Sequence, residues 1–246
     1  MPFNTWTPHA VSSEAFAWQG QVWRIVEAQH TASTMKLVDT LAEQDLLETL
    51  LESSKPKPRS EALGLHYLLA TPFRYNPKRG GSRFRSEIDP GVFYGAQSIR
   101  TAAAELGYWR WRFVKDSVGL DQLNPLAHTV FSCDLACSAV DLREEPFLKH
   151  QSTWLDSDQY VGTQYLARAA RKSSIQSILY WSTRDPQPSW CIAILDALVF
   201  KGVRPEIDPQ TWFLSVNQTS VSLRSQADAY TYEVDELLRN RNNAFE

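Results

Sequence analysis

Apolar residues recur at helical spacing in the first quarter of the chain. Residues 34–54 place them along one side of a helix, at Leu37, Val38, Leu41, Leu46, Leu47, Leu50 and Leu51. This spacing predicts one or two amphipathic helices, with Ser33 or Thr34 as the N-cap. The stretch Lys55-Pro56-Lys57-Pro58-Arg59 cannot continue a helix, because each proline lacks an N–H and biases the residue before it toward extended backbone. We therefore predict an N-terminal helical extension over residues 1–60 and a main domain over residues 61–246.

The period of the apolar positions changes after residue 60. Short apolar runs bounded by turn residues predict strands over residues 65–70, 91–94, 129–135, 138–142, 175–181, 191–200 and 211–216. Helical spacing predicts helices over residues 98–114, with Ser98 as the N-cap, and 158–171, and residues 230–239 have weak helical character. Because short turns such as Lys201-Gly202 join the later strands, antiparallel pairing is favoured over parallel crossovers. The predicted fold class is α+β, with mainly antiparallel sheets flanked by helices.

The composition is that of one globular core. The chain has 246 residues, of which 43% are hydrophobic, and its nine tryptophans supply large buried areas. With a formal net charge of −3, it has no overall positive field to hold nucleic acid or an anionic membrane, so an anion site must be local. No apolar run reaches the roughly 18 residues of a membrane span, and the three cysteines form no CxxC pair. We expect a cytoplasmic protein without a disulfide framework or a zinc site.

One run of positive charge interrupts this slightly acidic chain. Residues 73–85 contain no acid, and five cations, which are Arg74, Lys78, Arg79, Arg83 and Arg85. They also contain Gly80-Gly81, whose backbone N–H groups can approach a ligand closely. Phosphate binding requires this combination, although most charge runs are simply solvated loops. The window is therefore a candidate phosphate site, with an exposed basic loop as the alternative.

Two further windows place polar residues beside apolar ones. Glu105 lies at the edge of the apolar face of its predicted helix, where a carboxylate is costly unless it has a partner. Pairing with Arg110 or Arg112, or plain exposure, would also account for it. Tyr94 in a predicted strand is typical of a core aromatic, and Ser182 after an apolar strand is also good turn chemistry. No GxSxG surrounds Ser182 and no HExxH occurs, so neither a hydrolase elbow nor a metalloprotease site is predicted.

Taken together, the three windows resemble the RES domain, a family named for an Arg, a Glu and a Ser. Its pattern runs from an Arg in a Gly-Gly-Arg-Trp-like loop to a Tyr on a strand, a Glu eleven residues later on a helix, and a distant Ser at a strand end. The matching stretches are Gly80-Gly81-Ser82-Arg83-Phe84, Val92-Phe93-Tyr94, Glu105 and Leu179-Tyr180-Trp181-Ser182. Ser82 is inserted after the glycines and Phe84 replaces the usual Trp, so Arg85 is a rival to Arg83. The resemblance covers about residues 66–200, and Arg74 matches a further arginine that often precedes the loop.

The resemblance implies a fold and a chemistry. RES proteins look like mono-ADP-ribosyltransferases, and many are bacterial toxins paired with an Xre-type antitoxin. By this resemblance, the expected catalytic residues are Arg83, Tyr94 and Glu105, and the expected NAD⁺-binding residues are Arg74, Arg85 and Ser182. The expected reaction is cleavage of the nicotinamide–ribose bond of NAD⁺ without a metal, with inorganic phosphate or water as the acceptor. NAD⁺, phosphate and the antitoxin are the expected partners, with neither a membrane nor nucleic acid, and a homodimer is left open.

Two other functions stay open at this point. The same site would also serve a transferase that moves ADP-ribose to a protein. A binding module with this fold but without catalysis is the second alternative, because the run Tyr108-Trp109-Arg110-Trp111-Arg112-Phe113 has the aromatic and basic residues that stack on single-stranded nucleic acid. Helical spacing places these aromatics on several faces, which favours core packing instead. The presence of Arg83, Tyr94 and Glu105 together favours an enzyme.

Overall fold

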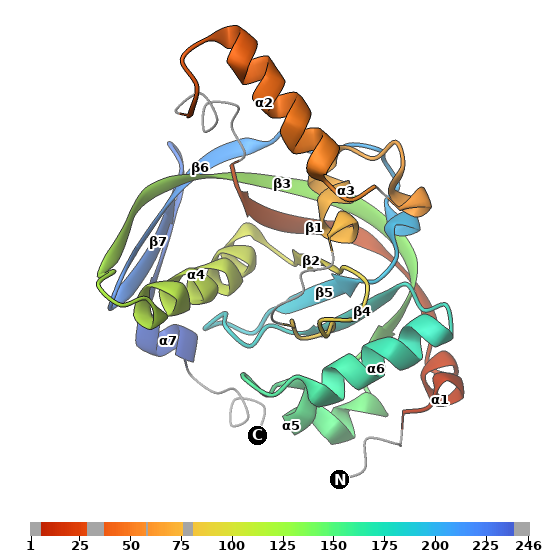
Figure 1. Ribbon diagram of the computed structural model, residues 1–246. Coiled ribbons are helices and arrows are strands. Elements are labelled where there is room, and N and C mark those ends of the chain that lie inside the picture. The colour runs from red at the N-terminus through yellow and green to blue at the C-terminus, as the bar shows by residue number, and fades with distance from the viewer. Residues whose placement is uncertain (1–5, 29–36, 58, 76–80, 239–246) are drawn as a thin grey trace.

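The computed structural model describes residues 6–28, 37–57, 59–75 and 81–238. Its centre is an eight-stranded sheet with the order β1-β2-β5-β4-β3-β6-β7-β8, in which β1 also pairs with β3. The first five of these strands therefore form a closed circuit, which β6, β7 and β8 extend from β3 (Figure 1). Neighbouring strands are antiparallel except β3 and β4, which are parallel. The predicted α+β class with a mainly antiparallel sheet and flanking helices is confirmed.

The elements have the following bounds. The strands are β1 (Phe16–Glu27), β2 (Phe93–Ala96), β3 (Gln122–Asp141), β4 (Ser177–Trp181), β5 (Trp190–Ile194), β6 (Gln210–Asn217), β7 (Ser220–Arg224) and β8 (Ala229–Glu233). The α-helices are α1 (Pro8–Ser12), α2 (Leu41–Ser54), α3 (Tyr67–Arg74), α4 (Ile99–Asp116), α5 (Gln151–Trp154), α6 (Val161–Lys172) and α7 (Val234–Leu238). No helix among the described residues is long and apolar enough to cross a membrane.

The sheet buries both of its faces. Along β5, Cys191 and Ala193 belong to one apolar cluster, and Ile192 and Ile194 belong to another. This alternation follows from the two-residue period of a strand. Helices α4 and α6 contribute to the first cluster and α3 to the second, so helices cover opposite faces (Figure 1).

Helix α4 follows its local sequence signals closely. The Ser98 hydroxyl accepts the Thr101 N–H at 3.2 Å, which confirms the predicted N-cap. The buried face of the helix includes Ala103, Ala104 and Tyr108. Burial of this face against the sheet fixes the rotation of α4 about its axis, and that rotation decides where Glu105 lies.

Two of the predicted elements are wrong. Residues 65–70, predicted as a strand, belong mainly to α3, where His66 caps the first turn and Leu69 and Phe73 are buried. A short apolar run has no period that separates strand from helix. The C-terminal tail, predicted to have helical character from Tyr230, instead begins with strand β8 and becomes helical only in α7.

The N-terminal segment also differs from the prediction of a helical extension over residues 1–60. Helix α2 is present, but β1 lies in the same segment and pairs with β3 along its whole length, from Phe16 opposite Ala139 to Glu27 opposite His128. Few of its side chains are fully buried, so β1 has no clean apolar alternation to reveal it. The N-cap of α2 is Thr40, which forms a capping box with Glu43, whereas Ser33 and Thr34 lie outside the described residues. The division of the chain at residue 60 stays a prediction.

The loop before β2 is fastened to α6 by one carboxylate. Asp89 Oδ1 accepts from Arg168 Nε at 2.9 Å, and Asp89 Oδ2 accepts from the Ser86 N–H at 2.8 Å and from the Ser86 hydroxyl at 2.6 Å. Burial raises the pKa of Asp89, but the hydrogen bonds from Arg168 and Ser86 outweigh it and lower the pKa from 3.8 to about 2. This fastening holds the loop that carries Arg83.

Gly91, at the end of that loop, packs directly on the backbone of α3. A β-carbon at this position would overlap the carbonyl group of Pro72, which cannot move without displacing the helix. We expect Gly91→Ala to lower the free energy of unfolding by about 3 kcal/mol or more. Gly202→Ala is the matched control, because its nearest neighbour would be the Arg204 oxygen at 3.4 Å. Denaturant unfolding checks both, and equal stability of the two variants would contradict the packing.

Replacing Asp89 should have an effect that depends on pH. The pKa of Asp89 is lower in the folded state, so its contribution is fully present above about pH 4 and is lost as pH falls through about 2. We expect Asp89→Asn to destabilise the fold by roughly 1–2 kcal/mol at neutral pH, and the difference from wild type to shrink in acid. Urea unfolding at several pH values measures it, with the exposed Asp208→Asn as control. A difference that stays constant down to pH 3 would refute the role of the carboxylate.

Candidate functional site

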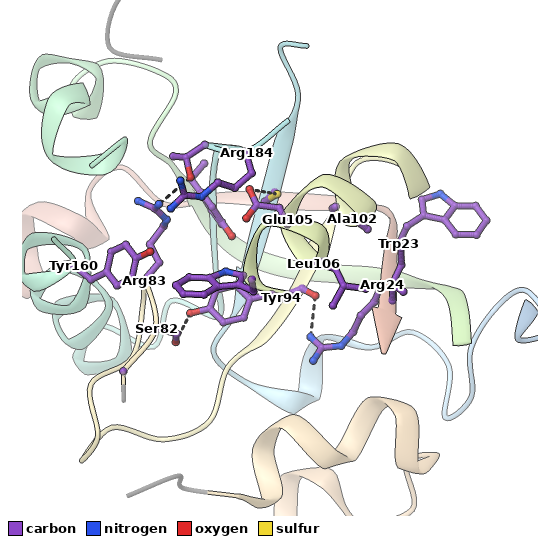
Figure 2. A pocket seen from close by; sticks show the side chains of 18 residues that line it. Trp23, Arg24, Ser82, Arg83, Tyr94, Ala102, Glu105, Leu106, Tyr160 and Arg184 are labelled. Carbon is purple, nitrogen blue, oxygen red and sulfur yellow. Dashed lines mark hydrogen bonds between the residues drawn. The ribbon is translucent and has the colours of Figure 1, made fainter. Parts of the chain in front are cut away.

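A cavity of about 440 Å³ opens between helix α4, strands β1, β2 and β5, and the loop that carries Arg83. Its volume lies within the usual range for small-molecule sites. The residues that line it are Trp23, Arg24, Ile25, Gly81, Ser82, Arg83, Tyr94, Gly95, Ala96, Ala102, Glu105, Leu106, Trp109, Tyr160, Tyr180, Thr183, Arg184 and Cys191. The three predicted catalytic residues, Arg83, Tyr94 and Glu105, are thus brought together (Figure 2).

Glu105 extends from α4 and is held by the end of strand β4. Its Oε1 accepts a hydrogen bond from the Ser182 hydroxyl at 2.5 Å and lies 3.9 Å from the thiol sulfur of Cys191. Ser182 is fully buried, and its oxygen accepts the backbone N–H groups of Arg184 and Asp185. Because these two donors occupy the oxygen of Ser182, its own proton is directed to Glu105. The other oxygen of Glu105, Oε2, accepts no hydrogen bond from the described part of the chain.

Arg83 is buried at one end of the cavity, to one side of Glu105. Its Nη1 donates to the carbonyl oxygens of Trp154 at 2.7 Å and Asp156 at 2.9 Å, and its Nη2 donates to the Thr183 hydroxyl at 3.0 Å. The guanidinium carbon lies 4.9 Å from the ring centroid of Tyr160. These contacts fix Arg83 in one position and tie its loop to the segment between α5 and α6.

Tyr94 on β2 also lines the cavity. Its hydroxyl shares a hydrogen bond of 2.8 Å with the Ser82 hydroxyl and accepts the Phe84 N–H at 3.1 Å. Burial raises the pKa of Tyr94, so the phenol stays protonated at neutral pH. The hydroxyl therefore fastens the Arg83 loop to β2, while the rest of the side chain lines the cavity.

Two arginines of the site were missed by the sequence analysis. Arg184 is buried, with its guanidinium carbon 3.4 Å from the ring centroid of Tyr108 and its Nη2 donating to the Ser157 carbonyl at 2.7 Å. Arg24 on β1 donates from Nη1 to the Tyr94 carbonyl at 2.9 Å. Burial lowers the pKa of Arg24 to about 10, so it remains a cation at neutral pH. No local motif marks either residue, because their positions depend on contacts between distant segments.

Three predicted binding residues do not line the cavity. Arg74 ends α3 and donates to a Glu52 carboxylate oxygen at 2.8 Å and to the Pro56 carbonyl at 2.5 Å. Arg85 is buried beside the cavity, and its backbone pairs with Ser82 in a tight turn. Ser182 contacts Glu105 instead of the cavity. The structure therefore does not bring Arg74, Arg85 or Ser182 to the cavity wall, and their role in NAD⁺ binding stays a prediction. Lys78 and Arg79 lie outside the described residues.

The charges of the site suit an anionic organic ligand. Arg24, Arg83 and Arg184 outnumber the single carboxylate of Glu105, although the whole chain is slightly acidic. Aromatic and aliphatic side chains form the other walls, among them Trp23, Leu106 and Trp109. Among the described residues, no three His, Cys, Asp or Glu side chains lie close enough to hold a metal ion. The arrangement can bind phosphate groups and an aromatic ring, and can place a carboxylate beside them.

Comparison with known proteins identifies one family. The family model described as the RES domain matches residues 57–217, which is more than half of the chain. No curated protein matches the sequence. Among solved structures, a crystal structure of the M. tuberculosis MbcT–MbcA toxin–antitoxin complex is similar, with 11% sequence identity, a TM-score of 0.49, and coverage of 97% of this chain and 98% of that chain.

Proposed function

Because the chain belongs to the RES-domain family, we propose that it is an enzyme that breaks the nicotinamide–ribose bond of NAD⁺. We propose further that it acts as the toxin of a toxin–antitoxin pair and that an Xre-type antitoxin inhibits it. The family pattern Arg, Tyr, Glu and Ser supports this assignment, since Arg83, Tyr94 and Glu105 line one cavity and Ser182 contacts one of them.

The observation that carries the proposal is the position of the Glu105 carboxylate. It lies between the buried arginines Arg83 and Arg184 and the apolar wall that contains Trp23 and Leu106 (Figure 2). A dinucleotide has the matching sequence of groups, with a diphosphate, a ribose and an aromatic base. The carboxylate would then lie beside the ribose, next to the bond that breaks.

The chemistry requires a negative charge at that place. When the bond between ribose C1′ and nicotinamide N1 breaks, the electron pair stays on N1 and neutralises the pyridinium ring. Positive charge develops on the sugar, and a fixed carboxylate stabilises it. Glu105 Oε2 suits this role because Oε1 is already held by Ser182. The acceptor then bonds to C1′, and when water is the acceptor the attached water loses one proton to solvent and becomes the new hydroxyl.

The other residues have supporting roles in this proposal. Tyr94 offers its ring to the nicotinamide or its ribose, because its hydroxyl is engaged by Ser82 and Phe84. Arg83 and Arg184 supply positive charge for the diphosphate. Inorganic phosphate, water or a protein side chain is the acceptor, and the products distinguish these outcomes.

Incubation of the purified protein with NAD⁺, with and without inorganic phosphate, tests the reaction. ADP-ribose-1″-phosphate, free ADP-ribose and ADP-ribosylated protein differ in mass, and each identifies its acceptor. We expect expression of the protein alone to lower cellular NAD⁺ and arrest growth, and co-expression of the antitoxin to restore growth. Unchanged NAD⁺ with a folded protein, in the tube and in cells, would overturn the proposal and favour a binding module.

Replacing Glu105 tests the catalytic assignment. We expect Glu105→Gln to keep the fold and to lower NAD⁺ turnover by about two orders of magnitude or more, because the amide has the same shape but no charge. Initial rates and thermal unfolding measure both properties. A folded variant that turns over NAD⁺ at nearly the wild-type rate would show that Glu105 is misassigned.

Replacing Ser182 tests how Glu105 is positioned. We expect Ser182→Ala to lower kcat by about 10- to 100-fold with a smaller change in KM, because Ser182 donates directly to the Glu105 carboxylate but holds Arg184 only by its backbone N–H. Ser189→Ala is the matched control, since Ser189 is also buried but bonds to Thr101 and Gln97 instead. Equal losses of kcat in the two variants would mean that Ser182 acts only through stability.

A further inference from the structure

Two of the three arginines that line the cavity, Arg83 and Arg184, lie together at one end, and Arg24 lies on the other side of Glu105. Figure 2 shows Arg83, Tyr160 and Arg184 on one side of Glu105, and Trp23 and Leu106 on the other. Among the described residues, neither Arg83 nor Arg184 forms an ion pair with a carboxylate. Buried cations without an anion are costly, so this end of the cavity is suited to an anionic ligand.

The two arginines differ in how many of their donors are already used. An arginine has five N–H donors. Arg83 donates three of them, to the Trp154 and Asp156 carbonyls and to the Thr183 hydroxyl. Arg184 donates to the Ser157 carbonyl and also lies beside the Tyr160 hydroxyl. Most of the Arg184 donors therefore have no acceptor in the described part of the chain, and Arg184 has more bonds to offer a ligand than Arg83 has.

Arg184 is also held ready for this contact. Its guanidinium carbon lies only 3.4 Å from the ring centroid of Tyr108, and its backbone N–H donates to the Ser182 hydroxyl. Because Ser182 donates to Glu105, the backbone of Arg184 and the carboxylate are positioned by the same side chain. A ligand that contacts Arg184 is thereby placed at a defined distance from Glu105.

We propose that Arg184 is the principal binding residue for the diphosphate of the dinucleotide, and that Arg83 is mainly a positioning residue that holds the segment from Trp154 to Asp156. This assignment rests on the proposed function, and it reverses the order of importance that the family pattern implies for the two arginines. A planar guanidinium that already stacks on an aromatic ring loses little freedom when it takes a bidentate contact with phosphate oxygens.

The affinity of ADP-ribose, which keeps the diphosphate, measures the contribution of Arg184. We expect Arg184→Gln to weaken binding of ADP-ribose by at least about tenfold in calorimetric titration, as is typical for the loss of a hydrogen bond to a charged group. Binding of nicotinamide riboside, which has no phosphate, should change by less than about twofold. Arg184→Lys keeps the charge but not the fork of donors, so it should show an intermediate loss for ADP-ribose.

Arg110→Gln is the matched control, because Arg110 lies on the outer side of α4, pairs with Glu27 and does not line the cavity. If Arg184→Gln does not fold, Arg184→Lys decides the question. Wild-type affinity in the variant, equal weakening for both ligands, or no binding of ADP-ribose by the wild type would each overturn the inference. A wild type that binds ADP-ribose through Arg184 but does not consume NAD⁺ would overturn the proposed function alone. Cleavage of NAD⁺ by Arg184→Gln with an unchanged KM would overturn this inference alone.

Discussion

A carboxylate on the apolar side of a packed helix needs a partner, and the hydrogen bond between Ser182 and Glu105 meets this need. It joins α4 to the end of β4, two elements that are far apart in sequence. The rotation of α4 is fixed by the burial of Ala103, Ala104 and Tyr108, and with this rotation Glu105 lines the cavity. The cavity lies beside this hydrogen bond, and α4 and the residues at the end of β4 both contribute to its walls.

The cationic end of the cavity has a different origin. Arg83 and Arg184 are buried without a carboxylate partner, and both donate instead to carbonyl oxygens between Trp154 and Ser157. Carbonyl dipoles stabilise a buried guanidinium while leaving its full charge in place. An acidic partner would stabilise the fold as well, but it would also compete with an anionic ligand for the same donors. The short segment between α5 and α6 thus keeps the positive charge available.

The sequence could predict the parts of this site that depend on local signals. Ser98 caps α4, and the eleven-residue separation of Tyr94 and Glu105 follows from a strand that runs directly into a helix. Local signals could not predict the pairing of Arg74 with Glu52 on α2, because it is a contact across the fold. Arg184 was not predicted as a site residue, since nothing near it in the sequence reveals its contact with the ring of Tyr108. Strand β1 was missed for a related reason, as its pairing with β3 is visible only when both strands are in place.

The net charge of −3 limits how an anion can reach this site. At physiological ionic strength, charges more than about 8 Å apart are largely screened where solvent reaches them, so the acidic surface neither attracts nor strongly repels a dinucleotide at a distance. Recognition must then come from contacts within the cavity, where screening is weak because Arg83 and Arg184 are almost fully buried. Short-range recognition depends on the directions of individual donors more than on total charge. For that reason the contacts that fix the arginines, the stacking on Tyr108 and the carbonyls after Trp154, matter as much to binding as the arginines themselves.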